Sequence, residues 1–598
     1  MTLKKTIFTI STALISILIL IAVITSHFNF GTYPPPHSSP AEYSKLSYVC
    51  NEVTKHILSS DGISCNFSIR NPETYLGQKR PDTLGTFDTY TFAKENAFFE
   101  NMLLKLSDIR TSSLSEKDKL TYNALYESLT LSLALGAYPL FSEPLSPISG
   151  IHTQLPILLG EYHFYDTGYI NTYFNILHSV PEYFNRIIEF EKYKASNNMF
   201  MSEELADTVI ERCREFIAKP VYNHLITSFD EKIKQFHTEP NSSAADFLTA
   251  EQLKAHSITN KNIVLNEIIP AYESLISAIE SLKTHCTPAK GLCLVSPPDK
   301  TASGKDYYAA LFRSRTCSDI PPDKAFSLFK KTLESCKNNI SQIDLSKIQN
   351  TTSLTTENPS DIVATLKQKM LTSYPDLKLN SFLEIKPVPE SLENSLSPAM
   401  YLTPPIDDFN NDCIYINNAS CDPESLYTTL AHEAFPGHMY QIRYFGSLNP
   451  EPVRLLLNFP GYAEGWATYA EIDMTDSIGY DTSTATLLKN NKLAVLCIYS
   501  LIDIGIHYYG WELFDTIKFL NENGFDDTHI AKELYTDIVY EPVIYPQYTL
   551  GCIEFMNMKK YAQKKQDKNF NPADFHRLIL ETGPIWFDDL WKIIKDKY

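Results

Sequence analysis

The chain has 598 residues, of which 43% are hydrophobic and 21% are charged, and this ordinary globular composition excludes a largely disordered chain and a multi-span membrane protein. Its 52 Lys and Arg against 71 Asp and Glu give a formal net charge of −19, which would repel a phosphate backbone, so no nucleic-acid partner is expected. Glycine is scarce, at 20 residues, and this favours a helical chain.

The N-terminus predicts a membrane anchor. Lys4 and Lys5 precede an uncharged run over residues 6–25, which as a helix would be about 30 Å long, the thickness of the bilayer's hydrocarbon core. The positive-inside rule then places the rest of the chain outside the cytoplasm. We expect a cytoplasmic stub and single-pass anchor over residues 1–28 and a stiff, proline-rich linker over residues 29–40. The alternative is a cleaved signal peptide and a secreted protein.

The chain has eleven cysteines, and several lie close together in the sequence. Two interpretations stay open: short-range disulfides in an oxidising compartment, or buried free thiols. No Cys-x-x-Cys pair occurs, so a cysteine zinc site is not expected. The close pairs are Cys50 with Cys65, Cys286 with Cys293, Cys317 with Cys336, and Cys413 with Cys421.

Apolar spacing divides the body into two parts. Residues 41–320 form an N-terminal helical part, in which the patterns over 205–226 and 250–282 predict long helices. Residues 291–322 are rich in proline and predict a loop. The second part, residues 321–598, begins with a predicted helix near Asp323.

The second part also contains the predicted β-structure. Short β-type runs over 382–385, 400–402 and 413–416, separated by prolines and polar turns, predict a small antiparallel sheet. A helix then begins with Asp422 as the predicted N-cap and Pro423 at the first helical position. The chain stays mostly helical from there to its end.

That helix runs into a His-Glu-Ala-Phe-Pro-Gly-His segment containing His432, Glu433 and His438. Zinc peptidases usually place two histidines at i and i+4 on one helix face, with Glu after the first. Here the spacing is i and i+6, which on a regular helix leaves the two side chains about 120° apart. Pro436 and Gly437 lie between them, and we expect a local bulge that lets both histidines point at one ion.

A zinc ion needs a third protein ligand and an open position for water. Glu464 and Glu471 are seven residues apart and share one face of a predicted helix, so either could reach the ion, and Glu464 is the preferred ligand. The alternative is a pair of solvated glutamates on an amphipathic helix. Two histidines and one carboxylate favour one Zn²⁺ per chain, although iron uses a similar ligand set.

These segments resemble a known family. Residues 432–438 followed by residues 464–467 look like the signature of the domain-of-unknown-function 885 family, whose members are similar to gluzincin zinc metallopeptidases. Weaker matches extend over most of the chain after about residue 40. The resemblance implies a mainly α fold: a two-lobed helical metallopeptidase-like body around a cleft, with a small antiparallel β-sheet beside the metal site. Many members carry a second histidine where this chain has Met439.

The resemblance and the residue chemistry imply the same mechanism. His432, His438 and Glu464 would hold zinc, and a fourth position would hold a water whose pKa the metal lowers toward about 7. Glu433 would act as the general base and pass the proton to the leaving amine.

The charged oxygen of the tetrahedral intermediate then needs a further hydrogen-bond donor. The candidates are His507, Tyr545 and Tyr548, because such enzymes often use His or Tyr there. Each has an alternative: His507 lies in an apolar run and would be a core histidine, and most of the 36 tyrosines are packing residues. In gluzincins an edge strand beside the metal pairs with an extended peptide, and residues 414–417 would be that strand unless they only cover the core.

Three functions stay open. The leading one is a membrane-anchored extracytoplasmic zinc-dependent metallopeptidase that hydrolyses peptide bonds of short peptides. The second is a metal-dependent amidase acting on cell-wall material. The third is an inactive peptidase-like protein that binds peptides or serves as an envelope scaffold. Glu433 favours activity, because a binding protein has no need of a general base. The expected partners are a peptide substrate and, through the N-terminal helix, the membrane; the sequence does not identify protein partners.

Overall fold

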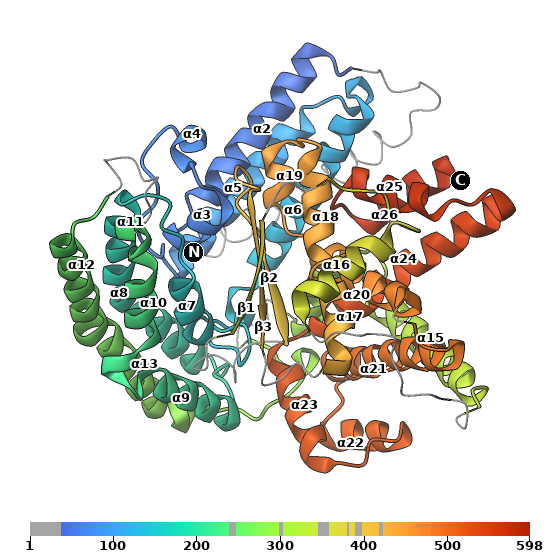
Figure 1. Cartoon of the computed structure of the whole chain (residues 1–598). Coiled ribbons are helices and arrows are strands. Elements are labelled where there is room, and N and C mark those ends of the chain that lie inside the picture. Colours follow the sequence, from blue (N-terminus) through green and yellow to red (C-terminus); the bar gives the residue numbers. More distant parts are fainter. Residues whose placement is uncertain are drawn as a thin grey trace, which may run out of the picture.

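The computed structural model describes residues 37–238, 247–297, 303–344, 348, 358–378, 382–388, 398–417, 423–477 and 479–598. The predicted anchor, most of the linker, Cys421 and Asp422 lie outside these residues. The fold is mainly helical, as predicted (Figure 1). The N-terminal helices are α2 (Pro40–Leu58), α3 (Gly62–Ser68), α4 (Pro72–Leu76), α5 (Thr89–Ser107), α6 (Glu116–Gly136), α7 (Ile151–Gly160), α8 (Gly168–Ser196), α9 (Glu203–Ile217), α10 (His224–Ile233), α11 (Gln235–Thr238), α12 (Ala250–Ile263) and α13 (Ile269–Leu282).

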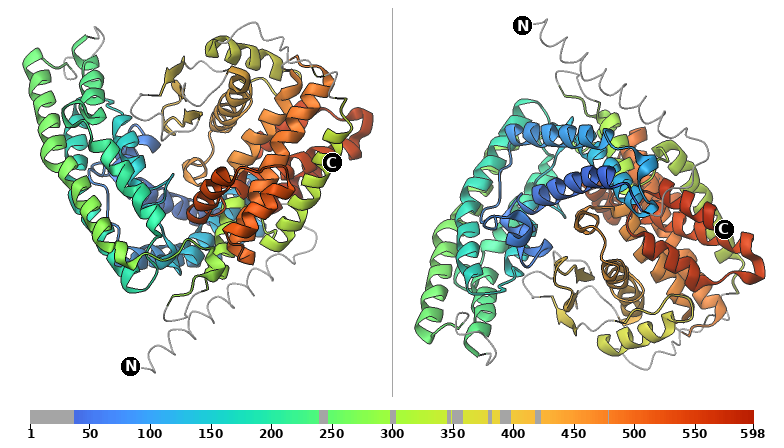
Figure 2. Two further views of the ribbon diagram at one scale, coloured as in Figure 1. Left: turned by 90° about the horizontal axis from the view of Figure 1, so that it is seen from below. Right: turned by 90° about the horizontal axis from the view of Figure 1, so that it is seen from above.

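The remaining elements include the strands. They are α14 (Gly304–Thr316), α15 (Pro322–Ser341), α16 (Pro359–Met370), β1 (Phe382–Pro387), β2 (Ala399–Leu402), β3 (Asn411–Ile416), α17 (Pro423–Glu433), α18 (His438–Ser447), α19 (Pro452–Leu456), α20 (Pro460–Met474), α21 (Thr482–Tyr509), α22 (Leu513–Glu522), α23 (Thr528–Tyr540), α24 (Ile544–Gln566), α25 (Pro572–Thr582) and α26 (Phe587–Lys597). Helices α8–α13 lie on one side of the strands, and α20 and α24–α26 lie on the other (Figures 1 and 2).

Two large hydrophobic cores underlie this arrangement. One is built from buried residues between Ile63 and Leu282, in the N-terminal helices. The other contains mostly residues after 308, from α14 to α26. Helix α14, which precedes the predicted boundary at residue 320, contributes Tyr308 and Phe312 to this second core.

The three strands occur where the sequence predicts them, but the predicted antiparallel sheet is wrong. The order is β1-β3-β2, with β1 parallel to β3 and β2 antiparallel to it, so the sheet is mixed. One face contributes Tyr401, Ile414 and Ile416 to the C-terminal core, while Tyr415 on the other face packs with Ile157 of α7.

The predicted edge strand is also wrong. Strand β3 is central, because Ile414 pairs with Ile385 of β1 on one side and with Tyr401 of β2 on the other. Its main-chain groups are therefore used within the sheet, and residues 414–416 have no open edge for a peptide. Strand β2 is an edge of this sheet.

Three helical predictions need correction. The stretch 205–226 is broken at Pro220 into α9 and α10, because proline cannot continue the helical hydrogen bonding. The stretch 250–282 is helical, but a π-helical turn at Val264–Ile268 separates α12 from α13 just before Pro270. The predicted loop over 291–322 contains α14, whose N-cap is Ser303.

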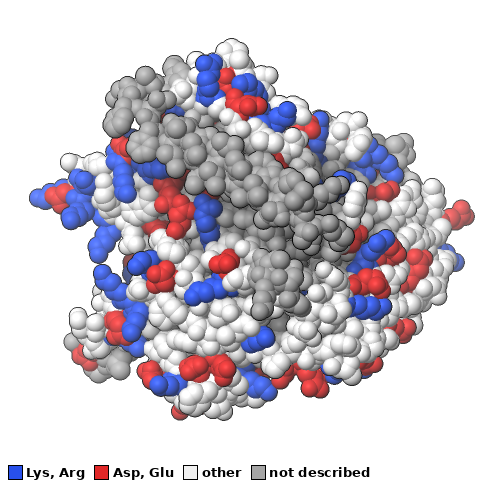
Figure 3. Space-filling model, turned by 180° about the vertical axis from the view of Figure 1, so that it is seen from behind, with Lys and Arg blue, Asp and Glu red and all other residues white. Residues whose placement is uncertain are grey.

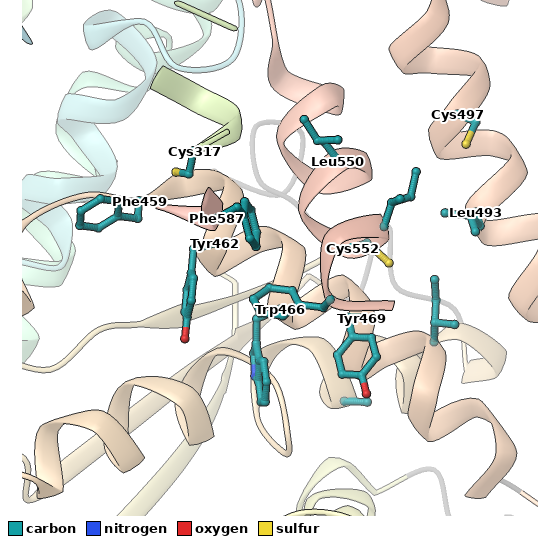
Figure 4. Close-up of a cluster of buried hydrophobic side chains, with 14 of the residues drawn as sticks. Cys317, Phe459, Tyr462, Trp466, Tyr469, Leu493, Cys497, Leu550, Cys552 and Phe587 are labelled. Atoms are coloured by element: carbon teal, nitrogen blue, oxygen red, sulfur yellow. The ribbon is translucent and has the colours of Figure 1, made fainter. Parts of the chain in front are cut away.

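Helices α20 and α24 cross in direct backbone contact. A Cβ added to Gly465 of α20 would lie 2.4 Å from the Cα of Gly551 of α24, so only glycine allows this approach. Figure 4 shows Tyr462, Trp466 and Tyr469 of α20 and Leu550 and Cys552 of α24, which belong to one buried cluster. This crossing fixes α20 against α24 close to Glu464.

The ten cysteines among the described residues are free thiols. Of the cysteines in the close pairs, four are buried (Cys50, Cys65, Cys317 and Cys336) and three are partly buried (Cys286, Cys293 and Cys413). Among the same residues, one helix is long and apolar enough to cross a membrane: α21. Because 72% of its apolar window is buried inside the protein, α21 is a core helix. The face drawn in Figure 3 carries basic and acidic side chains interspersed.

Candidate metal centre

The two histidines lie at the ends of two separate helices. Helix α17 ends at Glu433 and α18 begins at His438, so the expected bulge within one helix is instead a complete break over residues 434–437. Gly437 is tightly enclosed at this break, since a Cβ there would lie 1.7 Å from the carbonyl oxygen of His432. The chain direction changes between the helices, and the i, i+6 spacing no longer prevents the rings from meeting.

His432, His438 and Glu464 come together, each offering one ligand atom within 4.8 Å of the others. The Oε2 atom of Glu464 lies 3.5 Å from Nε2 of His432 and 3.4 Å from Nε2 of His438. The two imidazole rings are nearly perpendicular, with centroids 4.8 Å apart. The sequence-predicted ligand set is therefore one spatial cluster at the junction of α17, α18 and α20.

Glu471 occupies a different place from Glu464. Its Oε2 lies 3.4 Å from Nδ1 of His432, on the ring nitrogen that faces away from Glu464. Its Oε1 lies 2.9 Å from Nζ of Lys492 on α21. Because a metal-ligating histidine usually directs its second nitrogen at a carboxylate, Glu471 fits the role of an orienting partner and Glu464 that of a ligand.

The electrostatics of this cluster attract a cation. Burial alone would lower the pKa of His432, but Glu464, Glu471 and Glu433 outweigh it and raise that pKa to about 10. Burial would raise the pKa of Glu464, but the adjacent His438 and His432 hold it well below its usual range. A metal ion at this position would take the place of a proton on His432.

Glu433 faces the sheet with one carboxylate oxygen. Its Oε2 accepts a 2.8 Å hydrogen bond from the backbone N–H of Tyr401 in β2. The contact fixes one oxygen of the predicted base against the edge strand. The second oxygen is then the one available for a proton transfer.

Tyr548 of α24 lies beside the cluster. Its ring is 6.4 Å from that of His432, at an interplanar angle of 25°. Burial and the nearby carboxylates of Glu464 and Glu433 raise the pKa of the Tyr548 phenol well above its usual value. The phenol therefore keeps its proton and can act as a hydrogen-bond donor at the site.

The other two candidate donors make different contacts. Tyr545 lies one turn earlier on α24 and packs edge-on against Tyr499 of α21, with ring centroids 4.8 Å apart. His507 is fully buried: its Nδ1 accepts from the backbone N–H of Leu292 at 3.2 Å, and its Nε2 donates to the carbonyl of Ile538 at 2.8 Å. Both nitrogens of His507 are used by main chain, so the structure does not bring this residue to the cluster.

Two residues of the site were missed by the sequence analysis. Tyr401 holds Glu433 through its main chain, and nothing in its side-chain type signals that contact. Trp466 donates from its indole Nε1 to the carbonyl of Pro436 at 2.8 Å and so ties α20 to the turn between the helices. The Glu-Gly-Trp-Ala segment did carry a signal for Trp466, because a buried indole N–H needs a partner.

The donor set fits a zinc ion. Ligands held about 2.0–2.1 Å from zinc in a tetrahedral arrangement lie about 3.3–3.4 Å from one another, close to the two separations that Glu464 makes with the histidines. Hydrogen bonds would be shorter and better aligned, and the buried Oε2 of Glu464 has no hydrogen-bond partner. A cation bound here would satisfy this carboxylate oxygen, which lies between two imidazole nitrogens.

Two solved structures share the fold. A candidate lipoprotein from Colwellia psychrerythraea has a TM-score of 0.78 and 17% identity, covering 93% of this chain and 99% of its own. A candidate lipoprotein of unknown function from Shewanella oneidensis has a TM-score of 0.61 and 15% identity, covering 94% and 100%. No curated protein matches the sequence significantly. The family model described as bacterial protein of unknown function (DUF885) matches residues 72–592, and the chain belongs to that family, as its motifs predict.

Proposed function

We propose that this protein is a zinc-dependent metallopeptidase that hydrolyses peptide bonds of short peptides outside the cytoplasm. The observation that carries the proposal is the buried Oε2 of Glu464, which lies without a hydrogen-bond partner between the Nε2 atoms of His432 and His438. A zinc ion bound there would supply Lewis-acid activation of water and of the substrate carbonyl. A gluzincin-like active site is the chemistry that this ligand set and its neighbours support best.

Glu433 and Tyr548 would carry the proton and charge chemistry. Glu433 follows a proposed ligand directly, and with Oε2 held by Tyr401 it would take a proton on Oε1 and deliver it to the leaving amine. Tyr548, whose phenol keeps its proton, would donate to the oxygen that gains charge in the transition state.

Strand β2 would bind the substrate main chain. Asn417 donates to the carbonyl of Pro398, so in the alternation of an antiparallel pair Ala399 and Tyr401 turn their main-chain groups away from β3. Oε2 of Glu433 accepts a hydrogen bond from the N–H of Tyr401. The backbone N–H and C=O of Ala399 would then pair with an extended peptide. The peptide would lie along β2, between the N-terminal helices on one side of the strands and α20 and α24 on the other (Figures 1 and 2).

The location rests on two observations. The similar structures from Colwellia and Shewanella are of candidate lipoproteins, which supports an extracytoplasmic body held at a membrane. In this chain residues 1–28 would serve as the single-pass anchor.

The test is cleavage of a mixed peptide library by the full-length protein in detergent, with products read by mass spectrometry. We expect cleavage that stops with a chelator and falls at least about 100-fold in Glu433→Gln. The exposed Glu334→Gln serves as the matched control and should cleave like the wild type. Release of amides from cell-wall fragments without peptide cleavage would replace the peptidase by an amidase, and binding without cleavage of either would support the scaffold alternative.

A further inference from the structure

Tyr401 is held at both of its ends. Its backbone N–H donates to Oε2 of Glu433 at 2.8 Å, and its hydroxyl donates to Oδ1 of Asp412 in β3 at 2.7 Å. The residue is almost completely buried, and burial together with Asp412 raises the pKa of its phenol, which therefore remains a donor. Tyr401 thus links the end of α17 to the centre of the sheet.

Asp412 continues the link into α18. It is only 1% exposed, and its Oδ2 lies 3.6 Å from Nε of Arg443. Arg443 is also buried, and its guanidinium lies 5.0 Å above the ring of Phe409. The contact is an ion pair and not a hydrogen bond, since Nε of Arg443 has no hydrogen-bond partner among the described residues. Removing either charge would leave the other buried and uncompensated.

These contacts connect the two helices on either side of the turn between α17 and α18. Glu433 ends α17, His438 begins α18, and Arg443 lies five residues into the same helix. The path from Glu433 through Tyr401 and Asp412 to Arg443 therefore bridges the two helix ends from the sheet side. The covalent connection between the helices is the turn over 434–437. The contacts through the sheet are a second constraint on the position of Glu433 relative to His438.

We propose that Tyr401, Asp412 and Arg443 are positioning residues that hold the carboxylate of Glu433 in register with the metal ligands. The inference deepens the proposed function and rests on the zinc site. None of the three contacts the proposed ligands directly in the structure; they act through Glu433. Misplacing a catalytic group by about 1 Å costs on the order of 100-fold in rate, so a buried brace of this kind has a measurable effect.

The test measures binding of acetohydroxamate to the zinc-loaded full-length protein by calorimetry. Acetohydroxamate chelates zinc and gives up a proton that a neighbouring carboxylate accepts, so its affinity reports the placement of Glu433 without any turnover. Tyr401→Phe keeps the backbone N–H and removes only the hydroxyl. We expect it to weaken acetohydroxamate about 10-fold while zinc affinity changes less than about 2-fold.

A double-mutant cycle identifies the route of the effect. In a Glu433→Gln background, Tyr401→Phe should change acetohydroxamate binding less than about 2-fold, because its only route runs through the carboxylate already removed. Asp412→Asn should behave as Tyr401→Phe does. Tyr272→Phe, which removes a buried hydroxyl donating to the carbonyl of His152 in the N-terminal helices, is the matched control and should bind like the wild type.

The outcomes separate this inference from the proposed function. A zinc-loaded protein in which Tyr401→Phe has no effect, or has the same effect with and without Glu433, overturns the positioning role and leaves the zinc site standing. A wild-type protein that binds no zinc overturns both. If the wild-type protein binds zinc and shows the expected coupling between Tyr401 and Glu433 but cleaves no peptide, that result supports the positioning role and excludes the peptidase function.

Discussion

At the scale of single residues, the two glutamates of α20 make separate contacts because a histidine ring has two nitrogens. Glu464 faces Nε2 of His432 and Glu471 faces Nδ1 of the same ring. Their seven-residue spacing puts both on one helix face, and the sequence alone left open which one would be the ligand. The structure groups Glu464 with both histidines.

Replacing Glu471 tests its orienting role. In Glu471→Ala the His432 ring loses its carboxylate partner, and we expect zinc affinity to fall about 10–100-fold. Competition with a calibrated chelator measures the change. Glu554→Ala, which removes another buried glutamate of the same core, from its contact with Trp591, should leave zinc affinity unchanged. Equal zinc affinity in Glu471→Ala and the wild type would exclude the orienting role.

His507 makes folding sensitive to acid. Burial lowers its pKa to about 4 in the folded protein, against about 6.5 when unfolded. The unfolded chain binds the proton at a higher pH than the folded protein does. The stabilisation is therefore present above pH 6.5 and is lost as the pH falls toward 4, and the loss in unfolding free energy reaches about 2 kcal/mol at pH 5. The urea midpoint should therefore fall between pH 7 and pH 5, and His507→Gln should reduce that fall. An unchanged pH dependence in the variant would show that His507 is not buried in its neutral form.

At the scale of the elements, the break between α17 and α18 replaces the expected bulge. The turn over 434–437 is closed on one side by Gly437 and on the other by the Trp466 bond to Pro436. The break lets the two histidines approach from the end of one helix and the start of the next.

A side chain at Gly437 should disrupt the site. In Gly437→Ala the new Cβ meets the carbonyl oxygen of His432, and main chain cannot move aside as a flexible side chain would. We expect a loss of about 1–3 kcal/mol in unfolding free energy and a clear loss of zinc affinity. Gly524→Ala, at a glycine with φ of 89° and open space around it, should leave zinc affinity intact. Normal zinc binding by Gly437→Ala would contradict the tight turn.

Local sequence signals predicted the elements better than their pairing. The β-type runs gave the positions of all three strands, since those residues alternate and are bounded by turns. They did not predict that β1 pairs parallel with β3, because strand order depends on the long connections between the runs. Helix α14 was missed because flanking prolines and Gly304 suggested a loop, although Ser303 is a good N-cap.

At the scale of the whole molecule, the site is assembled from residues between 401 and 548 on separate elements. Motif spacing identified the proposed ligands, and a turn at Pro436 and Gly437 allowed the prediction that they lie close together. The place of Tyr548 depends on how α24 crosses α20, which Gly465 and Gly551 allow but no local pattern specifies. The bond from Tyr401 to Glu433 uses a main-chain N–H, so residue type carries no signal for it.

His507 illustrates the opposite case. Its place in an apolar run fitted both a donor near the metal and a core histidine. The structure gives both of its nitrogens main-chain partners. Only the packing of α21 against the segment around Leu292 and against α23 decides between the two, and that packing is a property of the whole fold.

The zinc content of the full-length protein, measured by elemental analysis beside that of Glu464→Ala, tests the proposed metal centre most directly. We predict about one zinc per chain in the wild type, lost or sharply weakened in the variant, because Glu464 supplies the carboxylate between the two histidines. A wild-type protein that holds no zinc after zinc is supplied would contradict the metal centre, as would a variant that holds zinc as tightly as the wild type.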